Sequence, residues 1–212
     1  MTLFAGRYRI LEALGSGAQG AAFRVADTHS SQSSAAVLKV GRSGHELTDG
    51  TLSEFEALRG LTTPYIAPVI RLGFASANDL ELIATHANVS SVEINQNAAL
   101  RPFLIRAWVD GLDLFSWSQR HVKDGAGSPE DLCRVLAHLT ESVAALHHAE
   151  LIHSDLKPVH VLISQVADPS SAKPILIDFG LAISNGAAQQ GDQGKSDGFA
   201  GGRHQQSNKK AI

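Results

Sequence analysis

The amino-acid sequence predicts an α+β fold in which an antiparallel sheet with one helix comes first and a mainly helical part follows. Three observations indicate this order. The ranges Tyr8–Leu14 and Ala21–Asp27 have the composition of strands and are joined by a glycine-rich turn. The range Leu47–Leu61 has the spacing of a helix. The range Ser128–His148 has the pattern of a long amphipathic helix.

The composition is that of an ordinary globular protein and excludes several classes. Hydrophobic residues make up 43% and charged residues 18% of the 212 residues, and the formal net charge is -3. An acidic balance provides no basic surface for nucleic acid. The single cysteine, Cys133, cannot form an intramolecular disulfide, and no stretch is long and apolar enough to cross a bilayer. We therefore expect a soluble cytoplasmic protein with no nucleic-acid partner and no membrane partner.

Further strands complete the predicted sheet. The range Ala35–Val40 forms a third strand, and Val69–Phe74 and Phe103–Val109 follow as two more. Between the last two, the polar range Ala75–Leu100 is predicted to be an insertion, with a strand of its own around Leu80–Ala84. No function follows from this insertion.

One helix and one strand each carry a charge on an apolar side. Glu54 falls at i, i+4 and i+7 with Leu58 and Leu61, so it shares their face of the predicted helix. A carboxylate on an apolar face needs a cationic partner. Lys39 lies inside the apolar strand Ala-Ala-Val-Leu-Lys-Val and needs an anion in turn. The sequence therefore predicts a contact between Lys39 and Glu54.

The start of the long helix is clearly marked. Ser128 is the expected N-cap, Pro129 takes the first helical position, and acidic residues fill the first turn. Two short apolar segments follow at Val161–Ile163 and Pro174–Ile177. Residues 184–212 are rich in Gly, Gln, Ser, Asn and Lys, a composition that cannot bury a core, so we predict a disordered tail.

Three short motifs carry the chemical signal. The first is Gly15-x-Gly17-x-x-Gly20, a turn whose backbone N–H groups can approach phosphate oxygens. Alone it is a weak signal, because flexible hairpins and dinucleotide-binding turns also contain it. Its place between two strands, instead of between a strand and a helix, argues against a dinucleotide-binding turn. The other motifs are His153-Ser-Asp155-Leu-Lys157-Pro-Val-His160 and Leu176-Ile-Asp178-Phe-Gly180.

Together with Lys39 and Glu54, these motifs stand in the order found in protein kinases. The chain resembles the serine/threonine protein kinases of eukaryotic type that are common in bacteria, over about residues 8–182. The resemblance implies a kinase N-lobe and hinge over residues 1–110, with the insertion at about 75–100, and an incomplete C-lobe over 111–183. It implies ATP and Mg²⁺ as cofactors.

The resemblance also assigns roles to single residues. Lys39 would hold the α- and β-phosphates and be steered by Glu54. Asp155 would accept the proton of the attacking hydroxyl, and Lys157 would offset charge on the transferred phosphoryl group. Asp178 would hold the magnesium ion. The nucleotide-binding residues implied by the resemblance are Gly15, Ser16, Gly17, Gly20, Lys39, Ala107 and Val109.

Two residues of the second motif depart from the family pattern. Ser154 stands where most members have an arginine that binds a phosphate on the activation loop, so we expect activity without such phosphorylation. His160 stands where the family has an asparagine that binds a second magnesium. As a metal ligand, His160 would change the metal preference. We favour weakened catalysis; the alternative is a histidine that hydrogen-bonds a neighbour while Asp178 alone holds the metal.

The third departure concerns the end of the fold. No proline follows Pro174, so the Ala-Pro-Glu motif that closes the activation segment of the family is absent. The helices that carry the peptide-docking surface in the family have no counterpart in this sequence. We therefore expect a truncated, mainly helical C-lobe, in which the apolar face of the Ser128–His148 helix loses part of its cover.

Three functions are consistent with this pattern. The leading hypothesis is an ATP-dependent serine/threonine protein kinase, truncated or weakly active, that acts on a protein substrate. The second is a catalytically impaired nucleotide-binding pseudokinase module that acts through a regulatory partner, which His160 and the missing lobe favour. The third is a small-molecule phosphotransferase of the kinase-like type. It ranks last, because Leu156-Lys157-Pro158 and the regular glycine turn are more similar to protein kinases.

Overall fold

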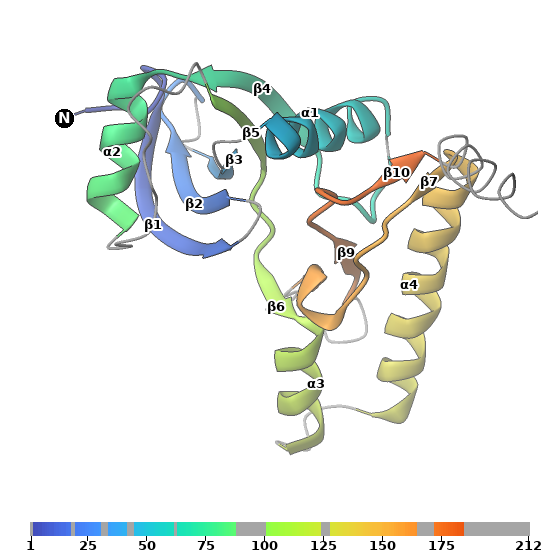
Figure 1. Cartoon of the computed structure of the whole chain (residues 1–212). Helices are drawn as coiled ribbons and strands as arrows, with labels where there is room; N and C mark the ends of the chain where they lie inside the picture. Colours follow the sequence, from blue (N-terminus) through green and yellow to red (C-terminus); the bar gives the residue numbers. More distant parts are fainter. Residues whose placement is uncertain are drawn as a thin grey trace, which may run out of the picture.

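The chain folds into two parts that meet side by side (Figure 1). The first part contains a five-stranded sheet and the helices α1 and α2, and the second contains short strands and the helices α3 and α4. The computed structural model describes residues 2–17, 20–30, 34–41, 45–61, 63–87, 101–123, 128–164 and 172–184. Within these ranges, no helix has the length and apolar content that a membrane span requires.

The sheet of the first part is antiparallel throughout, with the strand order β1-β2-β3-β5-β4. Each of the strands predicted for it from the sequence is present, with ends shifted by a few residues. Their bounds are β1 Tyr8–Gly17, β2 Gly20–Asp27, β3 Ala35–Gly41, β4 Val69–Ala75 and β5 Arg101–Ala107. Because β3 lies at the centre, its residues have neighbours on both sides.

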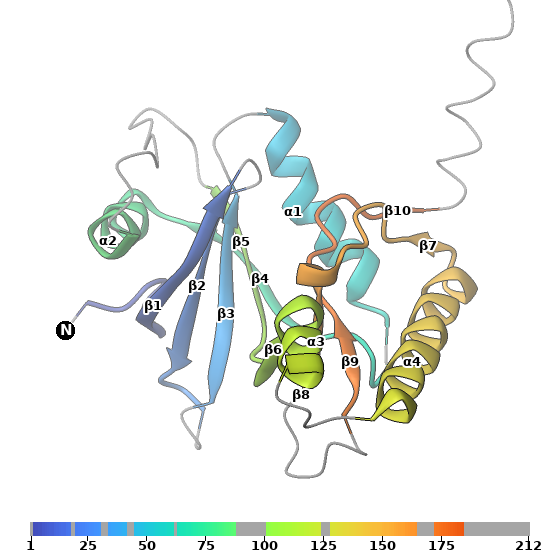
Figure 2. The ribbon, with the colours of Figure 1, turned by 90° about the horizontal axis from the view of Figure 1, so that it is seen from below.

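Two helices cover opposite faces of this sheet, α1 (His45–Leu58) and α2 (Ala77–Ala87), as Figure 2 shows. The first was predicted as Leu47–Leu61, and it begins and ends slightly earlier. The second corrects a prediction, because Leu80–Ala84 was expected to be a strand. Its buried residues Leu80 and Ile83 instead pack on the sheet core as one side of a helix.

Side-chain caps explain why α2 forms. The Ser76 side chain and backbone N–H both donate to Asp79 Oδ2, at 2.6 and 2.9 Å, which closes the first turn. Asp79 Oδ1 also accepts a hydrogen bond of 2.6 Å from the backbone N–H of Ala5, so α2 is tied to the start of the chain. The remainder of the predicted insertion, residues 88–100, lies outside the described residues.

The second part is built around a small antiparallel sheet of strand order β6-β8-β9. Its strands are β6 Gly111–Asp113, β8 Val161–Ser164 and β9 Pro174–Leu176. The other elements are α3 Leu114–Lys123, α4 Pro129–His148, the paired short strands β7 Leu151–Ile152 and β10 Ile183–Ser184, and the 3-10 helix η1 Pro158–His160. The helix α3 was not predicted from the sequence. Its start is capped by Asp113, whose Oδ1 accepts from Ser116 N–H at 2.9 Å.

The long helix α4 begins as predicted. Ser128 and Asp131 form a reciprocal capping box at its amino end. Leu146 is buried, whereas Leu132 and Leu136 are 37% and 46% exposed. The apolar face of α4 is therefore covered only in part, as the sequence led us to expect.

The core of the second part also includes residues of α1 and of the segment between α1 and β4. Leu58, at the end of α1, belongs to the same buried cluster as Leu176 and Phe179. Ile66 forms a parallel bridge with Leu176, next to the hydrogen bond of 2.8 Å from Leu176 N–H to the Tyr65 carbonyl. These contacts hold α1 between the two parts. The residues of the predicted tail that follow Ser184 lie outside the described residues.

Candidate nucleotide and phosphoryl-transfer site

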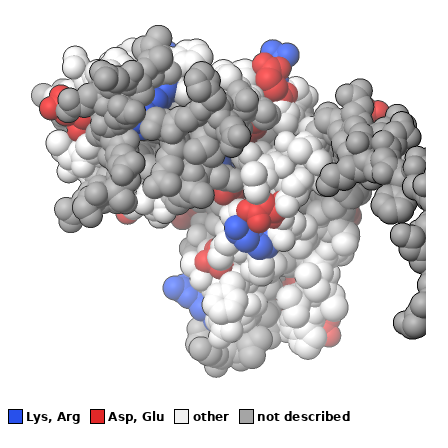
Figure 3. All heavy atoms as spheres, in the orientation of Figure 1, with Lys and Arg blue, Asp and Glu red and all other residues white. Residues whose placement is uncertain are grey.

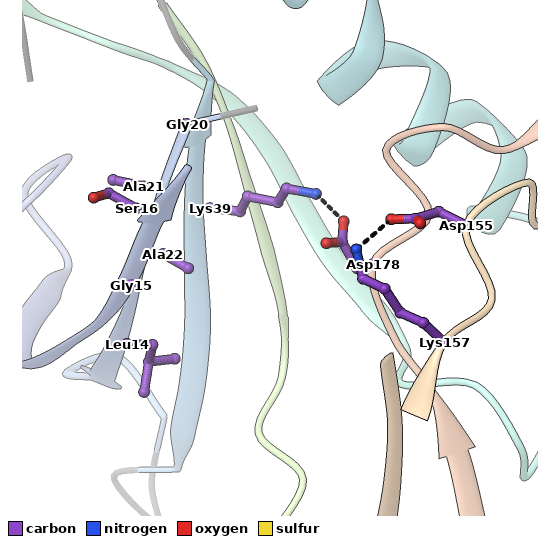
Figure 4. A pocket seen from close by; sticks show the side chains of 10 residues that line it. All are labelled: Leu14, Gly15, Ser16, Gly20, Ala21, Ala22, Lys39, Asp155, Lys157 and Asp178. Atoms are coloured by element: carbon purple, nitrogen blue, oxygen red, sulfur yellow. Dashed lines mark hydrogen bonds and ion pairs between the residues drawn. The ribbon is translucent and has the colours of Figure 1, made fainter. Parts of the chain in front are cut away.

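Lys39 lies at the centre of the site and joins three separate elements. It projects from β3, and its Nζ lies 2.8 Å from Glu54 Oε2 on α1. The same Nζ lies 2.6 Å from Asp178 Oδ1 after β9, a contact that Figure 4 shows. The Glu54 side chain is fully buried, which is tolerated because it is paired. Its other oxygen, Oε1, accepts a hydrogen bond of 3.4 Å from the Phe179 backbone N–H. The ion pair expected from the sequence is therefore present.

The electrostatics of this site hold Lys39 and Asp178 charged. Burial acts to lower the pKa of Lys39, but the neighbouring Glu54 and Asp178 carboxylates outweigh it and raise that pKa above its usual value. Burial acts to raise the pKa of Asp178, but Lys39 outweighs it and the pKa lies below the ordinary range. A cation at Lys39 and an anion at Asp178 thus face the same space.

The glycine-rich turn forms the other wall of that space. Gly20 has φ +137°, and a Cβ there would lie 2.0 Å from the Val40 carbonyl oxygen, so only glycine fits. A cavity of about 390 Å³ separates the turn from the carboxylates. It is lined by Leu14, Gly15, Ser16, Gly20, Ala21, Ala22, Lys39, Asp155, Lys157 and Asp178 (Figure 4). Gly17 pairs with Gly20 across the turn and does not line this cavity.

Asp155 approaches the cavity from the second part of the molecule. Its Oδ2 lies 2.9 Å from Lys157 Nζ, and this hydrogen bond holds the pKa of Asp155 below its usual value. Beneath it, the His153 ring lies 4.6 Å from the Phe179 ring, and its Nε2 lies 3.1 Å from the Ile177 carbonyl oxygen. Burial lowers the pKa of His153, so a neutral ring suits this packing role.

His160 lies between the two aspartates. Its Nδ1 lies 2.9 Å from the Asp155 carbonyl oxygen, and its Nε2 lies 3.2 Å from Asp178 Oδ2. Both of these oxygens accept hydrogen bonds, and the tautomer of the ring decides which of them receives one. With Lys39 on Oδ1 and His160 on Oδ2, both carboxylate oxygens of Asp178 already face nitrogen atoms.

The backbone around these groups is strained at two non-glycine positions. Ser154 and Asp178 both have φ of +63°, in the left-handed region that such residues rarely adopt. Residues held in this way cluster at functional sites, where the surrounding structure stabilises them. The strain therefore falls on the two segments that present Asp155 and Asp178 to the cavity.

A second cavity of about 250 Å³ adjoins the first, since both are lined by Leu14 and Ala22. It is lined further by Val37, Arg106, Ala107, Trp108, Val109, Gly111, Leu162 and Ile177. It therefore includes Ala107 and Val109, to which the resemblance assigns nucleotide binding. The Ala107 N–H donates to the Pro68 carbonyl at 2.9 Å, so it is not a donor for a ligand in this structure. The sequence analysis assigned no role to Arg106.

The charge of the site is mixed in sign. On the face shown in Figure 3, charged side chains of the described residues form small groups of both signs, one of them where the two parts meet. Within the described ranges, no group of three or more His, Cys, Asp or Glu is arranged to hold a metal ion by itself. Asp178, a hard oxygen ligand, suits Mg²⁺ when phosphate oxygens complete the coordination, whereas the His160 imidazole does not.

A two-part α+β fold with a glycine-rich hairpin, a lysine–glutamate pair and two carboxylates facing one cavity is the arrangement of a protein kinase domain. A family model described as the protein kinase domain matches residues 8–196. The chain therefore belongs to the protein kinase family.

Three of the similar proteins are bacterial serine/threonine-protein kinases. Serine/threonine-protein kinase C of Synechocystis sp. is 27% identical over 183 residues, which are 85% of this chain and 30% of that protein. Serine/threonine-protein kinase PkaA of Streptomyces coelicolor is 27% identical over 83% of this chain and 30% of its own length. Probable serine/threonine-protein kinase PknB of Lactococcus lactis is 25% identical over 85% of this chain and 24% of its own. The chain thus spans less than a third of the length of these curated relatives.

Proposed function

We propose that the chain is a serine/threonine protein kinase that transfers a phosphoryl group from a magnesium-bound nucleoside triphosphate to a protein hydroxyl. The family implies ATP as the donor. The observation that carries the proposal is Lys39, which lies between Glu54 and Asp178 on the wall of a cavity that the glycine turn closes. A protein substrate follows from the family, and a cytoplasmic location remains a prediction from the sequence.

The chemistry follows from the charges in the cavity. Lys39 would bind the phosphate oxygens, with Glu54 fixing its position from the buried side. The backbone of the glycine turn would donate further hydrogen bonds to them. Asp155 would accept the proton of the attacking hydroxyl while Lys157 offsets the charge that develops on the transferred group.

Magnesium would be held by Asp178 together with phosphate oxygens. A bound magnesium ion would neutralise charge on the phosphates. A metal ion held there would share the Asp178 carboxylate with the two nitrogens that it faces, Lys39 Nζ and His160 Nε2. His160 therefore competes with the metal instead of assisting it, and we propose that turnover is slow for this reason.

The second candidate function is a nucleotide-binding module without phosphoryl transfer, which acts through a regulatory partner. The position of His160, between Asp155 and Asp178, favours it. The two functions share nucleotide binding and differ in turnover, so they are separated by two measurements.

The first measurement is the melting temperature with and without a nucleotide. A saturating nucleoside triphosphate with Mg²⁺ should raise it, because a ligand that binds only the folded state stabilises that state. No shift with any purine nucleotide would remove both candidate functions.

The second measurement is the transfer of a labelled phosphoryl group to the chain itself or to a generic protein substrate. Asp155→Ala should abolish transfer while the nucleotide-induced rise in melting temperature remains. Glu81→Ala, an exposed acid on α2, is the matched control and should leave transfer unchanged. Nucleotide binding without transfer in the unaltered chain would favour the non-catalytic module, and full transfer by Asp155→Ala would reject the assignment of Asp155.

A further inference from the structure

Arg106 is a cation that lines the second cavity. It is the residue before the end of β5, and it pairs with Val37 of β3 in the sheet register. Paired residues project to the same face of a sheet, and Val37 and Arg106 both line the cavity. Lys39 lies two residues further along β3, so its side chain projects to that face as well. Arg106 therefore faces the cleft and not the core beneath α2.

The surroundings of Arg106 are otherwise apolar. The other side chains of the cavity wall are aliphatic or aromatic: Leu14, Ala22, Val37, Ala107, Trp108, Val109, Leu162 and Ile177. Within the described residues, its guanidinium has no hydrogen-bond or ion-pair partner. Burial lowers the pKa of Arg106, although the more distant carboxylates of Glu54 and Asp178 act in the opposite direction.

A guanidinium in such a place is costly unless something accepts its hydrogen bonds. Its planar fork presents several N–H donors and no acceptor, so its natural partner is a group with adjacent acceptor atoms. Arg106 is partly buried and lines an open cavity, so a ligand in that cavity is placed to supply the acceptor.

The purine base of the nucleotide is the group that would lie there. Ala22 and Val37 form the wall of this cavity on the sheet side, and Leu162 and Ile177 form it on the side of the second part. A flat ring held between these apolar walls presents its edge to residues 106–109. Guanine offers two adjacent acceptors on one edge, O6 and N7, which suit an arginine, whereas adenine has a donating amino group in place of O6.

We infer that Arg106 is a specificity-determining residue that makes the site favour nucleotides of 6-oxopurines, such as GTP, over ATP. The inference rests on the proposed nucleotide site, and it adds the class of base. Recognition comes from the N–H fork of the side chain and not from its charge alone. The expected preference is about tenfold in dissociation constant, which corresponds to about 1.4 kcal/mol and to one good arginine–guanine contact.

Calorimetric titration of the full chain with ATP, GTP and ITP, each in the presence of Mg²⁺, tests the inference. ITP carries the 6-oxo group but lacks the 2-amino group of guanine. GTP and ITP should therefore bind alike and more tightly than ATP. Binding of ATP as tight as that of GTP would overturn the inference and leave the proposed nucleotide site standing. Tight GTP with weak ITP would also overturn it, because the 2-amino group would then be what is recognised. No binding of any nucleotide would overturn both.

Two substitutions distinguish base recognition from simple charge balance against Glu54 and Asp178. Arg106→Met removes the donors and should abolish the preference for GTP over ATP. Arg106→Lys keeps the charge without the fork and should lose most of the preference too. A preference that Arg106→Lys retains in full would contradict the proposed contact. Arg71→Met is the matched control, because Arg71 is an exposed arginine on the neighbouring strand β4. This variant should retain the preference for GTP over ATP. Melting temperatures of the variants establish that each is folded.

Discussion

The half of the site that comes from the sheet is built differently from the half that comes from the second part of the chain. Lys39 and Glu54 lie inside regular elements, β3 and α1, and form a buried ion pair. Asp155, His160 and Asp178 lie in or beside short turns and a single turn of 3-10 helix, and Asp178 has a strained backbone. Backbone hydrogen bonds of the sheet and the helix hold the first half in place. The second half is held by contacts among its own side chains.

This difference shows where the chain retains the family pattern and where it departs from it. The sheet half keeps the lysine and glutamate that position phosphates. The second half keeps its carboxylates but carries Ser154 and His160 in place of the usual arginine and asparagine. Substitutions in the first half should therefore remove function, whereas one substitution in the second half should improve it.

The largest effect is expected for Lys39→Met. It removes the cation that joins Glu54 to Asp178, and leaves the buried Glu54 without its partner. Phosphoryl transfer should fall to background, and the affinity for the magnesium nucleotide should fall by at least about tenfold, as loss of one charge-assisted contact implies. Titration calorimetry and a labelled-phosphate assay measure the two effects. Lys173→Met, on the exposed surface, should change neither, and transfer by Lys39→Met at the normal rate would refute the role of Lys39.

A smaller loss is expected for Glu54→Gln. Glutamine still accepts the hydrogen bond from the Phe179 N–H but no longer holds the charge of Lys39. Turnover should fall by about ten- to hundredfold, which corresponds to the loss of one hydrogen bond between charged groups. Glu56→Gln provides a control on the same helix, because Glu56 is exposed and pairs only with Arg59 among the described residues. Equal losses in the two variants would mean that the buried pair has no special part in turnover.

His160→Asn is expected to act in the opposite direction. Asparagine supplies an oxygen ligand and removes the ring nitrogen that faces Asp178 Oδ2, so Mg²⁺ should bind more readily. Turnover should rise several-fold and saturate at a lower Mg²⁺ concentration in a magnesium titration. His148→Asn, at the exposed end of α4, is the control. Unchanged or lower turnover in His160→Asn would count against competition between His160 and the metal.

The smallest effect is an acid-dependent change in stability. Because the folded pKa of Asp178 is depressed, its ion pair with Lys39 stabilises the fold fully above the unfolded value of about 3.9. That stabilisation is lost as the pH falls further through the folded value. Urea unfolding should show Asp178→Asn to be less stable than the unaltered chain by about 1 kcal/mol at pH 7, with the difference shrinking as the pH falls through the depressed pKa of Asp178. A stability difference that grows as the pH falls would contradict a stabilising ion pair between Asp178 and Lys39.

Much of the fold could be predicted from the sequence, because its strands and long helices have clear periodicity and caps. The exceptions were α3, which was not predicted, and α2, which was predicted in part as a strand. Its apolar run from Leu80 to Ala84 is too short to distinguish a strand from a helix by pattern alone. The deciding signal was the cap formed by Ser76 and Asp79, three residues apart, which the polar surroundings concealed.

Some residues of the site could likewise be predicted from the sequence, and others could not. Lys39 and Glu54 could be paired from the sequence because each is a charge on an apolar surface. Arg106 could not be recognised as a cavity residue, because its position depends on the register of β5 against β3. The position of His160 between Asp155 and Asp178 could not be predicted either, because it depends on the path of two irregular segments.

The central claim is that the two halves converge on one triphosphate. A crystal structure of the chain with Mg²⁺ and a non-hydrolysable nucleotide triphosphate tests it directly. The account predicts phosphate oxygens within hydrogen-bond distance of Lys39 Nζ, a metal ion on Asp178, and the base in the cavity beside Arg106. A nucleotide bound elsewhere on the surface, with Lys39 still between Glu54 and Asp178 and the cavity empty, would contradict it.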